Sequence, residues 1–335
     1  MQRASFALWR IAAFTALLLV VLLAGCDGGG NGMEEEEEEE PTEPNVEAVQ
    51  YALSATPNDG ALPDGVSATV TFQALGESHT LVTLTLDNGP TGLGVAHPAH
   101  IHLNSADEGG DIEIFLAPID GLDQPANNAT SSRVVDRSLD DLLSFDGHVN
   151  IHESNANLGT IVAQGDVGAN AEGTSVDPLP LVDDPRSASY TLDPVANEGE
   201  IPDGVEATVV FEELGDDMTL VTLRLTDGPT GTPFGHPAHI HLNSADEGGG
   251  IEIFLAPIDG LSHPANDAVS SQIVDRSYDE LTGFDGHVNI HESNASLSTV
   301  IARGDVGANA GGNDGGDGGG GNDGGNDGGG YGGGY

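Results

Sequence analysis

The sequence predicts an all-β chain of two tandem antiparallel β-sandwich domains with disordered ends. The first reason is a duplication: residues 51–170 and 190–309 align at a constant offset of 139 without gaps and are identical at 82 of 120 positions. A repeat of this length is a whole domain, because solenoid units are much shorter. The second reason is that apolar and polar residues alternate within each copy, which is the period of a strand with one buried face.

The alternation places five strands in the first copy. Val70 and Phe72, for example, face one side of a strand while Thr69 and Thr71 face the other. The predicted strands cover residues 66–72, 82–86, 112–116, 149–151 and 161–163, with Gly- and Pro-rich breaks between them. Only residues 138–143 are predicted to form a helical turn. Strands this short within about 120 residues favour an antiparallel sandwich.

The N-terminal segment is predicted to be a targeting signal. Arg3 and Arg10 precede an apolar run, residues 11–23, that is short for a membrane span. The run ends in Leu23-Ala24-Gly25-Cys26, which resembles a bacterial lipoprotein lipobox. The resemblance implies cleavage before Cys26 and a lipid on its sulfur. We therefore expect an extracytoplasmic protein, lipid-anchored to a bacterial membrane in the periplasm or at the cell surface.

The remaining boundaries follow from composition. After the signal peptide, residues 1–25, comes an acidic tether, residues 26–45, with seven consecutive glutamates. Domain 1 covers residues 46–171 and domain 2 covers residues 189–310. A proline-containing linker, residues 172–188, joins them, and a Gly/Asn/Asp-rich tail, residues 311–335, is predicted to be disordered.

The charge balance excludes one class of partner. Eight basic residues, all arginine, stand against 55 acidic ones, for a formal net charge of −47. Such a surface repels phosphate backbones, so nucleic acid is not an expected partner. The composition resembles that of proteins adapted to a saline habitat. Because the chain has one cysteine, it has no internal disulfide.

Histidines are the candidate functional residues, since ten of the twelve recur at matched positions in the two copies. In the first copy, alternation places His100 and His102 on one face of a strand, with Ile101 and Leu103 directed to the core, and places His152 outward on another strand. Imidazoles two residues apart on a strand can converge on one ion, and imidazoles without thiolates suit copper or zinc. The predicted metal ligands are His100, His102, His152, His239, His241 and His291.

The other histidines receive weaker assignments. His148 is expected about 13 Å along the strand from His152, which makes it and its counterpart His287 weaker ligand candidates. His79 and His263 have no counterpart and are expected to be incidental. An alternative for all of them is that the rings hydrogen-bond to loops and hold no metal.

The same residues carry a family resemblance. His97-Pro-Ala-His100-Ile-His102, then Gly147-His148-Val-Asn-Ile-His152, then Gly165-Asp166-Val-Gly168 resemble the CHRD domain, the module named from chordin, over almost all of each repeat. The resemblance implies a secreted β domain whose molecular activity is poorly defined.

A more distant resemblance is to Cu/Zn superoxide dismutase, a β-sandwich of the immunoglobulin-like Greek-key type. It rests on the H-x-x-H-x-H spacing, on Asn150-Ile151-His152-Glu153 and on residues 165–168. It implies copper ligation by the six predicted ligands, with His97 and His236 in supporting positions. The dismutase's metal-linking Asp would fall at Ala156 and Ala295, its guiding Arg at Ile161 and Val300, and its zinc histidines are missing from residues 103–147 of the first copy.

Three functions follow as expectations. The first is a lipid-anchored, non-enzymatic binding module with a copper site in each repeat, copper being favoured over zinc. The second is a copper-dependent redox enzyme of the superoxide dismutase type. The third is a purely structural or adhesive surface protein. The missing Arg, Asp and zinc ligands favour the first.

Overall fold

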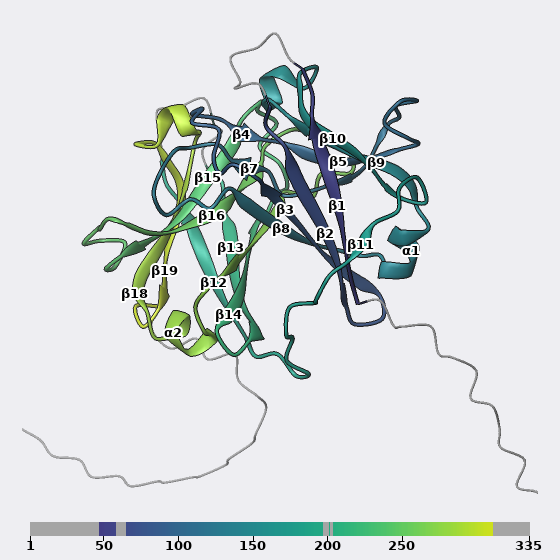
Figure 1. The fold of residues 1–335 in the computed structure, drawn as a ribbon. Coiled ribbons are helices and arrows are strands. Elements are labelled where there is room, and N and C mark those ends of the chain that lie inside the picture. Colours follow the sequence, from purple (N-terminus) through teal and green to yellow (C-terminus); the bar gives the residue numbers. More distant parts are fainter. Residues whose placement is uncertain (1–46, 58–64, 197–200, 202–203, 311–335) are drawn as a thin grey trace, which may run out of the picture. The chain divides into compact units, whose positions relative to one another are not determined.

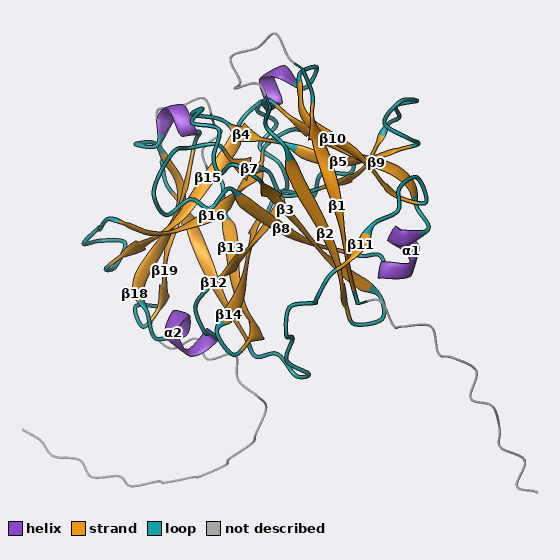
Figure 2. Cartoon of the chain, in the orientation of Figure 1, coloured by secondary structure: helices purple, strands orange, loops and turns teal. Residues whose placement is uncertain are grey.

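A computed structural model describes residues 47–57, 65–196, 201 and 204–310. The predicted signal peptide, Cys26, the acidic tether and the Gly/Asn/Asp-rich tail lie outside these residues. Within the described part of the chain, no helix is long and apolar enough to cross a membrane. The regular secondary structure is almost all strand, as the sequence predicts (Figure 2).

The first repeat runs from purple to teal in Figure 1. Its elements are β1 (Ala48–Ala55), β2 (Ala68–Leu75), β3 (His79–Leu86), β4 (Ala96–His97), β5 (Ala99–Leu103), β6 (Ile112–Phe115), β7 (Ile119–Asp120), β8 (Thr130–Val135), α1 (Leu139–Leu143), β9 (Asp146–His152), the 3-10 turn η1 (Asn155–Asn157), β10 (Ile161–Gly168) and β11 (Thr174–Ser175).

The second repeat runs from green to yellow. Its elements are β12 (Ser187–Pro194), β13 (Ala207–Gly215), β14 (Met218–Leu225), β15 (Gly235–Leu242), β16 (Ile251–Asp259), β17 (Val269–Val274), α2 (Tyr278–Thr282), β18 (Asp285–His291), the 3-10 turn η2 (Asn294–Ser296) and β19 (Val300–Gly307).

Each repeat has two antiparallel layers that share one strand. In the first repeat, β1 pairs with β2 through residues 48–53 and with β10 through residues 54–55. One layer then continues from β2 to β3 and β8, and the other from β10 to β9, β5 and β6. The second repeat follows the same plan through β12. The predicted all-β sandwich class is therefore confirmed.

The core lies between the layers and follows the predicted alternation. Ala68, Val70 and Phe72 are fully buried, and Val149 and Ile151 meet them from the other layer in one apolar cluster. The second repeat has the matching cluster.

The predicted helical turn is confirmed, whereas the predicted burial of Leu103 is wrong. The predicted helical turn is α1, where the Ser138 hydroxyl accepts the backbone N–H of Asp141 as an N-cap. Leu103 was expected in the core, but it is 37% exposed. It is the last residue of β5, where the chain turns away from the sandwich.

The two repeats join, which differs from the expectation of two separate sandwiches. Strand β8 of the first pairs with β17 of the second at Ser132 and Ser271, so one layer passes from repeat to repeat. Both repeats belong to one compact unit. The predicted linker, residues 172–188, also contacts the first repeat: β11 pairs with β1, and the Leu179 N–H donates to Oε1 of Gln73.

Candidate metal centres

The first candidate centre is built by two neighbouring strands. His100 and His102 lie two apart on β5, and His152 is the last residue of β9. The antiparallel register places His100 opposite Asn150 and His102 opposite His148, and the His152 N–H donates to the Pro98 carbonyl. Residues directly opposite on paired strands share a face, so all these side chains lie on one face of the layer.

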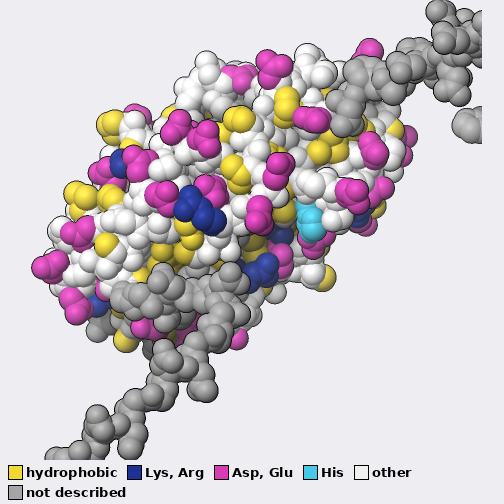
Figure 3. Space-filling view, turned by 90° about the horizontal axis from the view of Figure 1, so that it is seen from below, with side chains coloured by type: hydrophobic (Ala, Val, Ile, Leu, Met, Phe, Trp, Pro, Cys, Tyr) yellow, Lys and Arg dark blue, Asp and Glu magenta, His cyan; other side chains and the backbone are white. Residues whose placement is uncertain are grey.

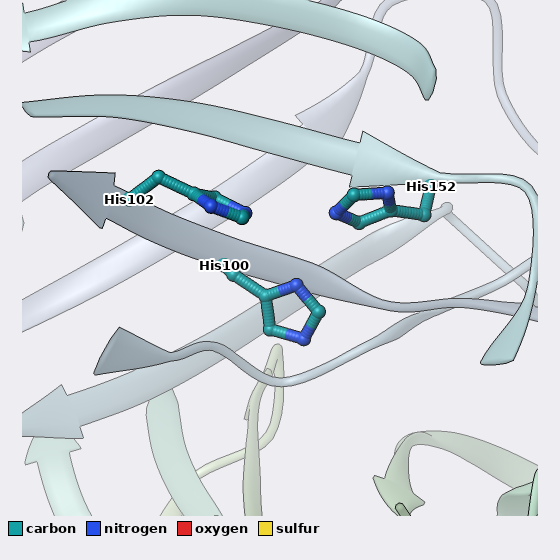
Figure 4. Close-up of side chains that lie close together, drawn as sticks. All are labelled: His100, His102 and His152. Atoms are coloured by element: carbon teal, nitrogen blue, oxygen red, sulfur yellow. The ribbon is translucent and has the colours of Figure 1, made fainter. Parts of the chain in front are cut away.

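The three rings converge (Figure 4). One ring nitrogen from each of His100, His102 and His152 lies within 4.8 Å of the other two. The ring centroids are 5.8 Å apart for the first pair, 5.1 Å for His100 and His152, and 5.9 Å for His102 and His152. All three residues are buried, with His102 the most exposed at 9%.

Hydrogen bonds select the nitrogen that two of the three rings present. Nδ1 of His102 donates to the Gly110 carbonyl at 3.0 Å, and Nδ1 of His152 donates to the Leu158 carbonyl at 2.7 Å. Since a carbonyl can only accept, the proton of each neutral ring is on Nδ1 and Nε2 carries a lone pair. These Nε2 atoms, and both nitrogens of His100, are buried without a hydrogen-bond partner among the described residues.

Burial keeps the rings neutral. It lowers the pKa of His152 to about 4 and that of His100 well below its usual value, and the neighbouring histidines lower both further. Burial also lowers the pKa of His102, against a raising effect of the bond to Gly110. Neutral imidazole is the form that binds a metal.

The second repeat has a matching triad, in which Nδ1 of His291, unlike Nδ1 of His152, has no hydrogen-bond partner among the described residues. His239, His241 and His291 also bring their nitrogens within 4.8 Å of one another. Burial lowers the pKa of His239 to about 3 and that of His291 to about 4. Nδ1 of His241 donates to the Gly249 carbonyl at 3.1 Å.

The donor set fits a metal ion. Each triad consists of imidazoles alone, and unpaired buried nitrogens cost free energy that a bound cation would recover. Three imidazoles match the ligand preferences of copper and zinc and not those of calcium or magnesium. Each of the two triads can therefore hold a metal ion.

His148 and His287 lie closer to the triads than the sequence suggests. The ring of His148 stacks on that of His102, with centroids 5.1 Å apart, because β9 places it directly across from His102. His287 and His241 repeat this arrangement. The expected separation of about 13 Å is that of His148 from His152 along one strand, whereas His102 lies across from His148 on the neighbouring strand. Nδ1 of His148 donates to the Asn104 carbonyl, and His148 is not a member of the triad.

His97 and His236 hydrogen-bond to the backbone next to the triads. Nδ1 of His97 donates to the Glu153 carbonyl at 2.8 Å, and its Nε2 accepts from the Thr91 hydroxyl at 2.7 Å. Both nitrogens are therefore used, and the ring holds the chain immediately after His152. A Cβ at Gly121 would lie 2.6 Å from Nε2 of His97, so glycine is needed there.

Two residues near the first centre were missed by sequence reasoning. The Phe115 ring meets that of His100 edge-on at 4.4 Å, and the His263 ring of the second repeat lies 5.0 Å from Phe115. His263 was expected to be incidental because it has no counterpart. The sequence contains no signal for this contact, which depends on how the repeats pack.

No family model matches the chain, and neither a curated protein nor a solved structure matches it.

Proposed function

We propose that this protein is a non-enzymatic, extracytoplasmic metal-binding module that takes up one copper ion in each repeat. The observation that carries the proposal is the set of buried, unpaired ring nitrogens in each triad, with the tautomers of His102 and His152 set by backbone carbonyls. Hydrogen bonding of the outer ring nitrogen is the usual way in which proteins orient metal-ligating histidines.

Copper is favoured over zinc by ligand chemistry. For a given nitrogen site, Cu(II) binds more tightly than Zn(II) in the Irving–Williams order. The closed setting supports binding over turnover, because no triad residue is more than 9% exposed. A redox enzyme needs its substrate to reach the metal.

The test is a titration of the full chain. Metal-free protein should bind two equivalents of Cu(II), and Zn(II) should bind at the same centres more weakly. The matched variant carries His100→Ala, His102→Ala, His239→Ala and His241→Ala together and keeps every acidic residue. If the variant binds both metals as tightly as the parent, the acidic residues are the binding groups and the proposal fails.

The same loaded protein tests for enzymatic activity. We expect little or no superoxide dismutation, because the positions of the guiding Arg hold Ile161 and Val300. Dismutation well above that of free copper would replace the binding role with the redox enzyme.

The proposed location rests on Cys26, the only cysteine. Cys26→Ser should remove the lipid and release the protein from membranes, and lipid labelling with fractionation after a high-pH wash measures both. If the variant stays in the washed membrane fraction, the lipid anchor is not at Cys26.

A further inference from the structure

The two centres differ in one neighbour that comes from the opposite repeat. Beyond the first centre, Phe115 separates His100 from the His263 ring. In Figure 4 the His100 ring lies on the side nearer the faint green ribbons of the second repeat. Beyond the second centre, Phe254 meets His239 in the same edge-on way, at 4.7 Å. The residue that corresponds to His263, however, is Gln124.

The loops that carry these residues have the same backbone. In residues 121–129, the Asn127 amide donates to the Leu122 carbonyl at 2.7 Å. In residues 260–268, the Asn266 amide donates to the Leu261 carbonyl at 2.8 Å. The difference between the loops is therefore carried by their side chains.

Each loop lies beside the phenylalanine of the other repeat. Ala265 and Asp267 line a cavity together with Phe115. Their counterparts Ala126 and Asn128 line a cavity together with Phe254. Each repeat therefore places the same loop beside the other repeat's phenylalanine, but the two loops carry different side chains at the positions of His263 and Gln124.

The loop over the first centre is also held more firmly. Arg133 on β8 reaches across and donates to the Val269 carbonyl at 3.0 Å and to the Asp267 carboxylate at 2.5 Å. Its counterpart in the second repeat is Gln272, whose side-chain amide donates to the Ile273 carbonyl of its own strand.

The phenylalanine beside the first centre is also more buried than the one beside the second. Phe115 is 1% exposed and His263 is half-buried against it. Phe254 is only partly buried, and Gln124 is exposed. The His263 ring is also oriented, since its Nδ1 accepts the N–H of Ala265 at 3.2 Å.

We propose that His263, on the loop clamped by Arg133, is a cap supplied by the second repeat that closes the Phe115 side of the first metal centre and leaves the second centre without a matching cap. The inference rests on the proposed function for its metal readout but not for its structural readout. The centres then have the same ligands and different access: the first exchanges its ion slowly and the second exchanges it quickly.

The structural readout uses the metal-free, folded full chain. Brief treatment with diethyl pyrocarbonate, followed by mass spectrometry of the peptides, measures how fast each ring is modified. His239 should react faster than His100, by about two- to tenfold, which is the scale of one aromatic contact. His263→Gln should raise the rate at His100, and the reciprocal Gln124→His should lower the rate at His239. Arg133→Gln should act like His263→Gln, more weakly.

The metal readout uses the copper-loaded full chain mixed with excess chelator. Release should follow two phases of equal amplitude, and His263→Gln should accelerate only the slow one. His79→Ala is the control, since His79 lies on the surface beside Asp136.

The outcomes separate the two proposals. Equal modification rates at His100 and His239, or rates unchanged by His263→Gln, would overturn the cap even if two ions bind. Unequal rates that respond to both reciprocal substitutions, in a chain that binds no copper at the triads, would keep the cap and remove the proposed function.

Discussion

At the scale of the residue, the number of hydrogen-bonded ring nitrogens decides what a buried histidine can do. His97 and His102 are both buried on the first repeat's strands, but His97 uses both nitrogens, whereas His102 keeps Nε2 unpaired. The His97 ring therefore has a structural role, and the His102 ring is a ligand candidate. Burial alone does not distinguish them.

The first prediction concerns stoichiometry. His102→Ala removes one ligand nitrogen from the first triad and should reduce copper binding from two equivalents to one. His241→Ala should do the same in the second, and the double variant should bind none at the triads. Calorimetry of the full chain measures this. Loss of both ions in a single variant would show that the centres are not independent.

The second prediction concerns acid. Burial lowers the pKa of eight histidines, four in each repeat. The unfolded chain takes up protons at these rings below about pH 6.5, while folded His152 does so only near pH 4. The stability that neutral rings retain above pH 6.5 is therefore lost as the pH falls toward 4.

The magnitude of this effect is large. His152, His239 and His291, whose pKa values burial lowers to about 4, 3 and 4, each remove about 2 kcal/mol between pH 6.5 and 5, against a typical total of about 5 to 15 kcal/mol. The burial-raised pKa values of Asp120 and Asp259 act in the opposite direction, but they are two groups against eight. We expect the metal-free chain to lose stability steeply as the pH falls below 6.5. His152→Gln should move the acid midpoint lower, and the exposed His79→Gln should not. Circular dichroism measures the midpoint, and constant stability from pH 7 to 5 would contradict the assignment.

At the scale of the element, short turns connect the repeats. The Asn155 amide of η1 donates to the Asp259 carboxylate at the end of β16, at 2.7 Å. The Asn294 amide of η2 donates to the Asp120 carboxylate on β7, at 2.9 Å. The two contacts are related by the repeat, so each copy supplies one donor and one acceptor.

The third prediction follows from this contact. Asn155→Ala leaves the buried Asp259 carboxylate with one donor among the described residues in place of two, the Leu261 backbone N–H at 2.8 Å, and should cost about 1 to 3 kcal/mol of stability. Combined with Asp259→Ala, the loss should be smaller than the sum of the single losses, because one interaction is removed twice. Urea unfolding at pH 7.5 gives the values. Asn170→Ala, whose partner is Asp146, should be additive with Asp259→Ala. Additivity in the Asn155 cycle would mean that the contact contributes nothing.

At the scale of the whole molecule, the excess of acidic side chains is the main electrostatic feature. Acidic side chains are spread over the face shown in Figure 3, with few arginines among them. Repulsion among like charges destabilises a compact state, and salt screens it within about 10 Å at 0.1 M and about 3 Å at 1 M.

The fourth prediction is that molar NaCl raises the melting temperature well above its low-salt value. Sucrose is the control, because it is excluded from the protein surface without screening charge. A melting temperature that does not respond to NaCl would mean that the acidic residues which repel one another lie in the segments outside the two repeats.

The sequence by itself determined the strand class, the duplication, the α1 turn and the six candidate ligands. Each depends on local information, since a period of two places alternate residues on one face whatever the strand packs against. Two imidazoles at HxH spacing share a face for the same reason.

Only the tertiary structure decided which rings keep an unpaired nitrogen, that His148 lies across from His102, and that the repeats share a layer. These depend on strand register and on contacts between residues more than one hundred positions apart, such as Arg133 with Asp267. His263 shows the limit most clearly. Its neighbours along the chain resemble those of Gln124, and its position over Phe115 comes entirely from the packing of one copy against the other. The order of residues within one copy contains no information about how the two copies pack.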